Sequence, residues 1–403
     1  MTQAQSENIS PPSEKGDEKT TVLYLNHVSQ MSGAEQSLRA LLWQFRRSGT
    51  DIEPVIALPG GGPFADTLRE EAWNVTFAPM RRLHRPQGFI DGVASLMHVL
   101  QTAPFIARLG KQTGAHIIHS NSTTAHLVGG LAAERINVPS VWHVRDLVPL
   151  TKIAPALAAR STVVIAISYS VAQRLEEDGV PKEKICTIHN GLDPDEWNAP
   201  DSTAGRTLRE TLGIEDDAFV FGCVGQLVPW KNHKAFIEAA ASLMQDDNSE
   251  KARFVIMGGD LWGEQKDYVK ELRTLVKEYN LQGRFNFVPH QNDAVTALSA
   301  LDCIVLASHE EPFGRVLIEG MSLRKPVIAF NENGPSEIIT HEKDGLLVDP
   351  HFEDGLAMAM MQVLREPELR HLLTENGRAA VMQKFHIADS AQKIADLYHK
   401  IRD

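Results

Sequence analysis

The sequence predicts an α/β fold with two parallel β-sheets that are covered by helices. Short segments of almost continuous apolar character, such as residues 21–25, alternate with longer segments of helical periodicity along most of the chain. This alternation is typical of parallel sheets with helices on both faces. It occurs in two series, separated near residues 193–203 by a proline-containing segment that is suited to a linker. A chain of 403 residues is long enough for two or three domains.

The first series follows a polar N-terminus. Residues 1–19 are rich in Ser, Glu, Gln and Pro and lack apolar periodicity, so we expect a disordered tail. A strand at 21–25 leads through a loop with Gly33 into a helix at 36–46. Further strands are expected at 54–58, 75–78, 116–119, 140–144, 163–167 and 185–188, with helices that include 64–72 and 90–111. The helix at 90–111 is apolar over much of its circumference, which favours a place in the core over a membrane surface.

The second series repeats the pattern of strand, loop and helix. Its strands are expected at 219–225, 253–257, 284–288, 303–307, 327–330 and 345–348. Its helices are expected at 234–244, 268–279 and 352–364, and a final helical pattern at 387–401 ends the chain. Two series of this kind predict two separate parallel sheets joined by the linker.

The composition excludes several classes of function. A formal net charge of −12 argues against a nucleic-acid-binding protein, which needs a basic surface. Cys186, Cys223 and Cys303 lie in apolar runs without metal-ligand spacing, so we expect the reduced thiols of a cytoplasmic protein. The N-terminal residues lack the apolar stretch of a signal peptide, and we find no window of 18 apolar residues that predicts a spanning helix. We therefore expect a cytoplasmic protein that lies, at most, at the cytosolic face of a membrane.

The most informative stretch of the sequence is residues 308–337. A buried strand ends in a loop that contains Glu311 and Gly314, and the helix that follows carries Glu319. The N-terminus of such a helix directs free N–H groups and the positive end of its dipole towards a ligand above the strand, which suits a phosphate. A second glycine loop, with Gly334, follows the next strand. Both loops would face one crevice at the carboxyl ends of the strands, where open parallel sheets bind ligands.

Three features of this stretch resemble the nucleotide-sugar site of the GT-B retaining glycosyltransferases of family 4. They are the Glu311/Glu319 pair with seven residues between its members, the Pro-Phe-Gly inside the pair, and the Gly-Pro-x-Glu at 334–337. Two unrelated surface carboxylates at this spacing are the alternative interpretation of the pair. The resemblance extends over residues 21–400, nearly the whole chain after the tail.

The resemblance implies the GT-B architecture, in which two Rossmann-like domains face each other across a cleft. The N-terminal acceptor domain would span 20–195, the C-terminal donor domain 205–385, and a C-terminal helix, 386–403, would cross back to the first domain. The implied activity is the retaining, metal-independent transfer of a sugar from a nucleotide diphosphate sugar, with a UDP-sugar favoured, to an acceptor hydroxyl. Such a reaction would serve polysaccharide, glycolipid or other glycoconjugate biosynthesis, and no cofactor is implied beside the donor substrate.

On the donor side, the family places two cations on the diphosphate, an Arg directly after a glycine and a Lys five positions later. Lys231 matches the second position, while Gln226 stands at the first and Arg315 is a candidate substitute. A fixed cation beside the leaving diphosphate lowers the barrier electrostatically. The alternative for Lys231 is a solvated lysine at the start of a helix.

The two glutamates have different implied roles. Glu311 would accept hydrogen bonds from the sugar and stabilise an oxocarbenium-like transition state, and Glu319 would accept bonds from the ribose hydroxyls. The other donor-side residues that the resemblance implies surround the sugar, the diphosphate and the base: Gly33, His290, Phe313, Gly314 and Val316.

On the acceptor side, His143 matches a cleft histidine that the family places near the transferred sugar. With Glu311 and Lys231 it completes the implied catalytic set, and a satisfied core histidine is the alternative. Asn121, Arg145 and Asp146 are acceptor-side or structural candidates. The basic cluster at 80–85 suits a phosphate-bearing acceptor or anionic lipid headgroups, and a solvated loop equally well.

The expected partners are a nucleotide-sugar donor and a carbohydrate, lipid-linked or small-molecule acceptor, with peripheral membrane contact through the N-terminal domain as an option. Asp193-Pro-Asp195 matches a metal-binding D-x-D pattern, but it lies in the linker, so we favour a turn and expect no metal site. Two alternative functions stay open. One is a non-catalytic nucleotide-binding scaffold, which the neutral Gln226 would suit, and the other is a related enzyme such as a nucleotide-sugar epimerase.

Overall fold

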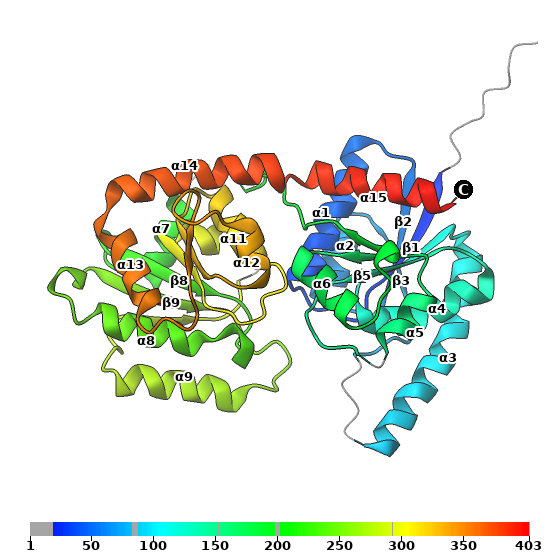
Figure 1. Ribbon diagram of the computed structural model, residues 1–403, viewed down its shortest axis with the longest axis horizontal. Coiled ribbons are helices and arrows are strands. Elements are labelled where there is room, and N and C mark those ends of the chain that lie inside the picture. Colours follow the sequence, from blue (N-terminus) through cyan, green and yellow to red (C-terminus); the bar gives the residue numbers. More distant parts are fainter. Residues whose placement is uncertain (1–18, 83–87, 152, 198–201, 292, 403) are drawn as a thin grey trace, which may run out of the picture.

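The computed structural model describes residues 19–82, 88–151, 153–197, 202–291 and 293–402. It consists of two α/β lobes that lie side by side (Figure 1). The predicted disordered tail lies outside the described residues, apart from Lys19. Each lobe contains one parallel sheet with helices on both sides, as the sequence predicts.

The sheet of the N-terminal lobe has seven parallel strands in the order β3-β2-β1-β4-β5-β6-β7. Its strands are β1 (Thr20–Leu25), β2 (Ile52–Leu58), β3 (Asn74–Phe77), β4 (Ile117–Ser120), β5 (Ser140–Val144), β6 (Val163–Ala166) and β7 (Ile185–Thr187). Its helices are α1 (Gly33–Ser48), α2 (Pro63–Glu70), α3 (Phe89–Thr113), α4 (Thr123–Ile136), α5 (Ala154–Ala159) and α6 (Tyr169–Glu177). The strand order reverses between β1 and β4, so the loops after these two strands open a crevice.

The sheet of the C-terminal lobe has six parallel strands in the order β10-β9-β8-β11-β12-β13. Its strands are β8 (Phe219–Val224), β9 (Ala252–Met257), β10 (Phe285–Val288), β11 (Cys303–Leu306), β12 (Val327–Phe330) and β13 (Leu346–Val348). Its helices are α7 (Ser202–Thr211), α8 (His233–Leu243), α9 (Lys266–Glu278), α10 (Ala294–Ser299), α11 (Arg315–Ser322), α12 (Asn333–Ile338), α13 (Gly355–Arg365) and α14 (Pro367–Lys384). Here the order reverses between β8 and β11, which places their loops together.

The predicted strands are confirmed, and each end lies within two residues of its predicted position. They were recognisable because each is a short apolar run that is buried on both faces of a parallel sheet. Short 3-10 turns at Lys182–Lys184, Pro229–Lys231 and Asp247–Ser249 complete the regular structure.

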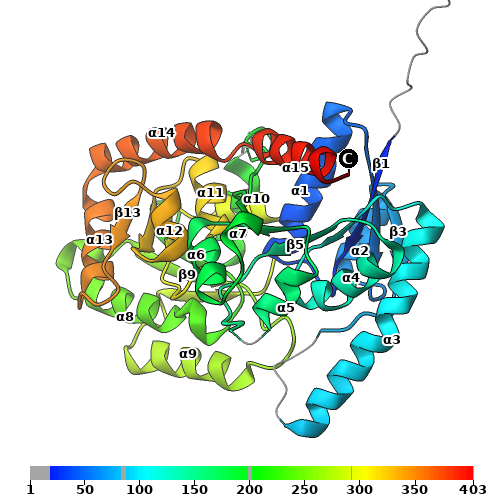
Figure 2. The same cartoon turned by 45° about the vertical axis from the view of Figure 1, so that its right-hand side comes forward.

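The chain crosses between the lobes twice, and the two crossings lie beside each other. Leu192 pairs with the residues at the start of α15 (Ile387–Arg402): its N–H donates to the Phe385 carbonyl at 3.0 Å, and its carbonyl accepts from the Ile387 N–H at 2.9 Å. After the second crossing, α15 packs against α1 of the N-terminal lobe, while α14 stays on the C-terminal lobe (Figures 1 and 2). The final helix therefore crosses back to the N-terminal lobe.

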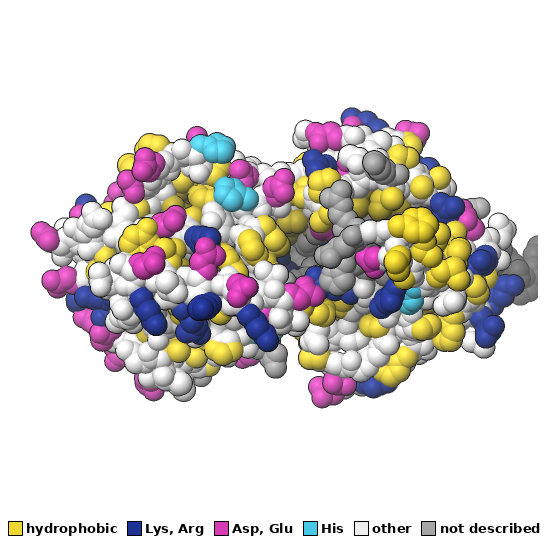
Figure 3. Space-filling view, turned by 90° about the horizontal axis from the view of Figure 1, so that it is seen from below, with side chains coloured by type: hydrophobic (Ala, Val, Ile, Leu, Met, Phe, Trp, Pro, Cys, Tyr) yellow, Lys and Arg dark blue, Asp and Glu magenta, His cyan; other side chains and the backbone are white. Residues whose placement is uncertain are grey.

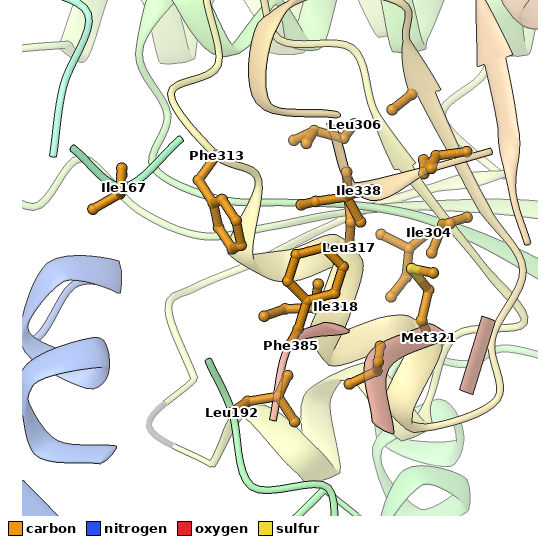
Figure 4. Close-up of a cluster of buried hydrophobic side chains, with 14 of the residues drawn as sticks. Ile167, Leu192, Ile304, Leu306, Phe313, Leu317, Ile318, Met321, Ile338 and Phe385 are labelled. Atoms are coloured by element: carbon orange, nitrogen blue, oxygen red, sulfur yellow. The ribbon is translucent and has the colours of Figure 1, made fainter. Parts of the chain in front are cut away.

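One hydrophobic cluster extends from one lobe to the other. Ile167 and Leu192 from the N-terminal side lie near Phe313, Ile318 and Phe385 (Figure 4). All five side chains are almost completely buried. Apolar burial of this kind stabilises association by about 25 cal/mol per Å² removed from water, so it holds the lobes together at the base of the cleft.

Helix α3 is only partly a core helix, contrary to the expectation. Its second half is buried through Val99, Ala103, Ile106 and Ala107, but its first half leaves the domain and is largely exposed. By length and composition alone α3 could cross a membrane, with 22% of its most apolar window buried. Periodicity identified the helix correctly, whereas its burial depends on where the rest of the domain ends.

Candidate active site

A cavity of about 320 Å³ lies between the lobes at the carboxyl ends of the strands. Its walls come from the loops after β8, β9, β10 and β11, and from the loop after β1 in the other lobe. Nine residues predicted for the donor side line it: Gly33, Gln226, Lys231, His290, Glu311, Gly314, Arg315, Val316 and Glu319. The structure thus brings together residues that are separated by more than 280 positions in the sequence.

Lys231 and Glu311 form an ion pair at the cavity wall. The Lys231 Nζ lies 2.6 Å from the Glu311 Oε2, and the two side chains are only 15% and 8% exposed. The Lys231 Nζ also lies 4.4 Å from the centre of the Trp230 ring. Because the pair is shielded from water, its charges act more strongly on a ligand than surface charges would.

The N-terminus of α11 is open to the cavity. Gly314 precedes the helix with φ of 92°, a left-handed conformation that favours glycine, and no side chain caps the helix there. Gly334 holds the loop from the other side, because its N–H donates to the Glu311 carbonyl at 3.0 Å. A Cβ on Gly334 would lie 2.4 Å from the Phe313 Cα, so only glycine permits this approach. The backbone N–H groups at the start of α11 are consequently fixed in place for an anion.

Arg315 places a second cation at the cavity, which Gln226 lines as a neutral residue. Its Nε donates to the Glu319 Oε1 at 2.5 Å, one helical turn away. Its Nη1 donates to the Ser37 Oγ at 3.2 Å, and Ser37 belongs to α1 of the other lobe. Arg315 therefore connects the two lobes as well as lining the cavity.

Phe313 is placed differently from its predicted neighbours. Its side chain is 2% exposed and points away from the cavity into the cluster between the lobes (Figure 4). Its ring centre lies 5.9 Å from those of His189 and Phe385. Phe313 thus anchors the loop between β11 and α11 in the hydrophobic cluster between the lobes and does not line the cavity.

The acceptor-side candidates lie in the N-terminal lobe, and they occupy different environments. His143 and Arg145 line a small cavity of about 20 Å³ together with Ser37, the residue that Arg315 contacts. Asn121 is fully buried, and its Oδ1 accepts from the Arg145 Nε at 2.9 Å, so it orients Arg145. Asp146 lines neither cavity, and burial raises the pKa of its carboxyl group.

Burial keeps the imidazole of His143 neutral. It lowers the pKa of His143 well below the ordinary value, and the positive charge of Arg145 lowers it further. The pKa of His119, its neighbour on β4, is lowered well below the ordinary value for the same two reasons. Burial also lowers the pKa of Arg145, to about 10, so this guanidinium stays charged near neutral pH.

The Gly-Pro-x-Glu at 334–337 contributed to the resemblance, but the contacts that Glu337 makes across the cleft could not be predicted from the sequence. Glu337 accepts hydrogen bonds from the backbone N–H groups of Tyr169 and Ser170, both at 2.8 Å, at the start of α6 in the other lobe. It also contacts the His189 Nε2 at 2.9 Å. The partners are about 150 to 170 positions away, so local pattern could not reveal them. Gly258 and Gly259 at the cavity were recognisable in principle, because two glycines directly follow the strand β9.

No group of three or more His, Cys, Asp or Glu residues that could hold a metal is found among the described residues. Asp193 of the Asp-Pro-Asp segment accepts from the Asp195 N–H at 3.1 Å and forms an ion pair with Arg47. This is the geometry of a turn.

Two family models match successive parts of the chain. The model described as Glycosyltransferase Family 4 matches residues 31–196, and the model described as Glycosyl transferases group 1 matches residues 205–380. Together they cover both lobes.

Similar proteins agree with these models. A UDP-Gal:alpha-D-GlcNAc-diphosphoundecaprenol alpha-1,3-galactosyltransferase of Escherichia coli is 28% identical over 352 residues, 84% of this chain and 86% of the relative. A D-inositol 3-phosphate glycosyltransferase of Saccharomonospora viridis is 26% identical over 304 residues, 70% of each chain. The crystal structure of Anabaena HepE in complex with UDP and glucose matches with a TM-score of 0.81 and 26% identity over 94% of this chain and 100% of that chain.

Proposed function

Because the chain belongs to the GT-B glycosyltransferases of group 1, we propose that its cleft transfers a hexosyl group from a UDP-sugar to an acceptor hydroxyl, with retention of configuration and without a metal. The observation that carries the donor assignment is the cavity itself. It combines an open helix N-terminus, two cations and two carboxylates: the positive groups suit a diphosphate, and the carboxylates suit sugar and ribose hydroxyls. The crystal structure of the similar HepE protein with UDP and glucose supports UDP as the nucleotide.

The cations take the place that a metal would otherwise fill. As the bond between the sugar C1 and the phosphate oxygen breaks, negative charge develops on the leaving diphosphate. Lys231, Arg315 and the N-terminus of α11 line the space where this charge would lie. Preorganised positive groups in a water-poor site stabilise such charge.

Retention of configuration is supported by the ion pairs that the carboxylates in the cavity form. The carboxylates among the described cavity-lining residues are Glu311 and Glu319, and each is paired with a cation. Neither is free to act as a general base, so the acceptor proton would pass to the leaving phosphate oxygen while the acceptor oxygen attacks C1 from the same face. Closure of the cleft would exclude water from this step.

The acceptor is best explained as lipid-linked, and the protein as peripheral on the cytosolic face of an anionic membrane. Six apolar residues share one side of α3: Phe89, Ile90, Val93, Leu96, Met97 and Leu100. They are between 43% and 86% exposed, and hydrophobic side chains gather on this face of the N-terminal lobe (Figure 3). Arg108 and Lys111 are exposed in the last turns of the helix, and Arg81 lies beside its first half, where its Nη2 donates to the Ala94 carbonyl at 3.5 Å. An apolar face flanked by cations suits an anionic bilayer surface.

The double substitution Phe89→Ser and Ile90→Ser should weaken binding to vesicles of phosphatidylcholine and phosphatidylglycerol by about tenfold or more, since each side chain gives up about 1.5–3 kcal/mol of apolar burial. Co-sedimentation measures the binding. Phe352→Ser is the matched control, because Phe352 is 58% exposed but lies on the C-terminal lobe. If the double variant and Phe352→Ser bound vesicles equally well, the membrane assignment would be contradicted. It would also be contradicted if the double substitution dissociated a dimer in solution and left vesicle binding unchanged.

The proposed transfer is tested by the release of nucleotide diphosphate from UDP-, GDP- and ADP-sugars with a chelator present. We expect slow hydrolysis of one UDP-sugar without acceptor. Activity that disappears with the chelator and returns with a divalent ion would overturn the metal-free reaction. Nucleotide binding without turnover of any donor, with or without lipid-linked acceptor, would favour the non-catalytic scaffold, for which the neutral Gln226 is the supporting observation.

A further inference from the structure

A chain of buried polar groups connects the C-terminal helix to the cleft. The hydroxyls of Tyr24 on β1 and Tyr398 on α15 lie 2.7 Å apart, and the Tyr398 hydroxyl lies 2.6 Å from the His119 Nδ1. The His119 Nε2 in turn lies 3.2 Å from the His143 Nδ1. All four side chains are at most 3% exposed, so each contact is made without competing water.

The direction of the hydrogen bonds is fixed by a charged group at one end. The Arg145 Nη2, which can only donate, lies 3.4 Å from the same His143 Nδ1. The Nδ1 of His143 must therefore be the unprotonated nitrogen, and it accepts from the His119 Nε2–H. The His119 Nδ1 then accepts from the Tyr398 O–H, and the Tyr398 oxygen accepts from the Tyr24 O–H. The reverse direction would set the His143 Nδ1–H against the Arg145 N–H.

This order leaves one donor unused. With Nδ1 as an acceptor, the single proton of the neutral His143 is on Nε2, and this atom is buried without a partner among the described residues. His143 lines the small cavity beside Ser37, and Ser37 contacts Arg315 of the donor cavity. A buried N–H without a partner is unfavourable, so a ligand oxygen that accepts from it would be bound favourably.

We propose that Tyr398 is a positioning residue that holds His143, through His119, with its proton on Nε2, so that this N–H donates to an oxygen of the transferred sugar or of the acceptor. This inference rests on the proposed function and assigns a defined role to the histidine: His143 is a hydrogen-bond donor to the substrate and not a base. It also makes the C-terminal helix a part of the site, since Tyr398 is supplied by α15.

The tautomer can be measured directly by two-bond ¹H–¹⁵N correlation NMR of the histidine rings in the full-length protein. The His143 signals are assigned by their loss in His143→Gln. In the wild-type protein we expect a protonated Nε2 and an unprotonated Nδ1 at His143. A protonated Nδ1 would overturn the proposal, and this result would not depend on any donor being turned over.

Tyr398→Phe and Tyr24→Phe form a matched pair, because each removes one buried hydroxyl from the same contact. Tyr398→Phe removes the donor to His119 and should give a mixture of His143 tautomers and lower kcat about tenfold. Tyr24→Phe leaves the Tyr398 hydroxyl in place as the donor to His119, so it should change neither the His143 tautomer nor kcat. If Tyr398→Phe lowers the rate of donor hydrolysis without acceptor, the His143 Nε2–H donates to the transferred sugar. If it lowers only the rate of transfer, the Nε2–H donates to the acceptor. Identical tautomers and kcat in the two variants would refute the role of Tyr398.

Discussion

Replacing Glu311 by alanine should lower kcat by about 10²-fold or more while the affinity for UDP changes little. Glu311 lines the cavity next to Lys231, where its carboxylate would face the sugar ring as positive charge develops at C1. The diphosphate affinity should persist because Lys231, freed from its partner, can interact with the phosphates. Steady-state kinetics with the active donor and calorimetric titration with UDP measure the two quantities.

Glu310→Ala is the control for this experiment. Glu310 is the preceding residue in the same loop, but it is exposed and does not line the cavity. The substitution should leave kcat and UDP affinity close to their wild-type values. If Glu311→Ala lowered UDP affinity as strongly as kcat, Glu311 would act in nucleotide binding and its assignment to the sugar would be wrong.

Lys231→Ala should weaken UDP binding by about 10- to 100-fold, the equivalent of losing one charge-assisted hydrogen bond in a poorly solvated site. The loss has two causes that act in the same direction. The diphosphate loses a cation, and the carboxylate of Glu311, which is 8% exposed and 2.6 Å from the Lys231 Nζ, is left unpaired beside it. Titration with UDP at low and high salt checks the electrostatic origin of the effect.

Lys234→Ala provides the matched lysine. Lys234 lies on α8 three residues further on, and its ammonium pairs with Glu271 at the surface, where it is 40% exposed. Its loss should change UDP affinity by less than a factor of about two, as expected for a surface ion pair. Unchanged affinity in Lys231→Ala would remove this residue from the donor site.

The fold, and the way most of the donor-side candidates gather at one cavity, could be predicted because the sequence signals are local. Each strand is a short apolar run, and the glycine loops, Lys231 and the Glu311/Glu319 pair lie directly after such strands. The carboxyl ends of parallel strands share one edge, so placing each residue after a strand was enough to place it at the cleft.

What the sequence could not predict depends on contacts between distant segments. The inward direction of Phe313 depends on the close approach of Gly334 and on Phe385, 72 positions later. Tyr398 forms a hydrogen bond with His119, which is 279 positions away in the sequence, and Glu337 accepts one from Tyr169 of α6, 168 positions away. Helix α3 was recognised by its period, but the extent of its exposure depends on how far the neighbouring helix α4 extends along it.

The paired crossings at Leu192 and Phe385–Ile387 determine how the lobes can move. A single connecting segment would act as a swivel and allow rotation in every direction. Two adjacent segments joined by two backbone hydrogen bonds should act as a hinge with a single axis. Twisting one lobe about the long axis of the molecule would break both hydrogen bonds. The remaining motion is a swing about the line of the crossings. Away from the crossings, the lobes are also joined by Arg315 with Ser37 and by Glu337 with the start of α6. Arg82 of the N-terminal lobe pairs with Glu264 of the C-terminal lobe as well. We expect these contacts to separate when the cleft opens.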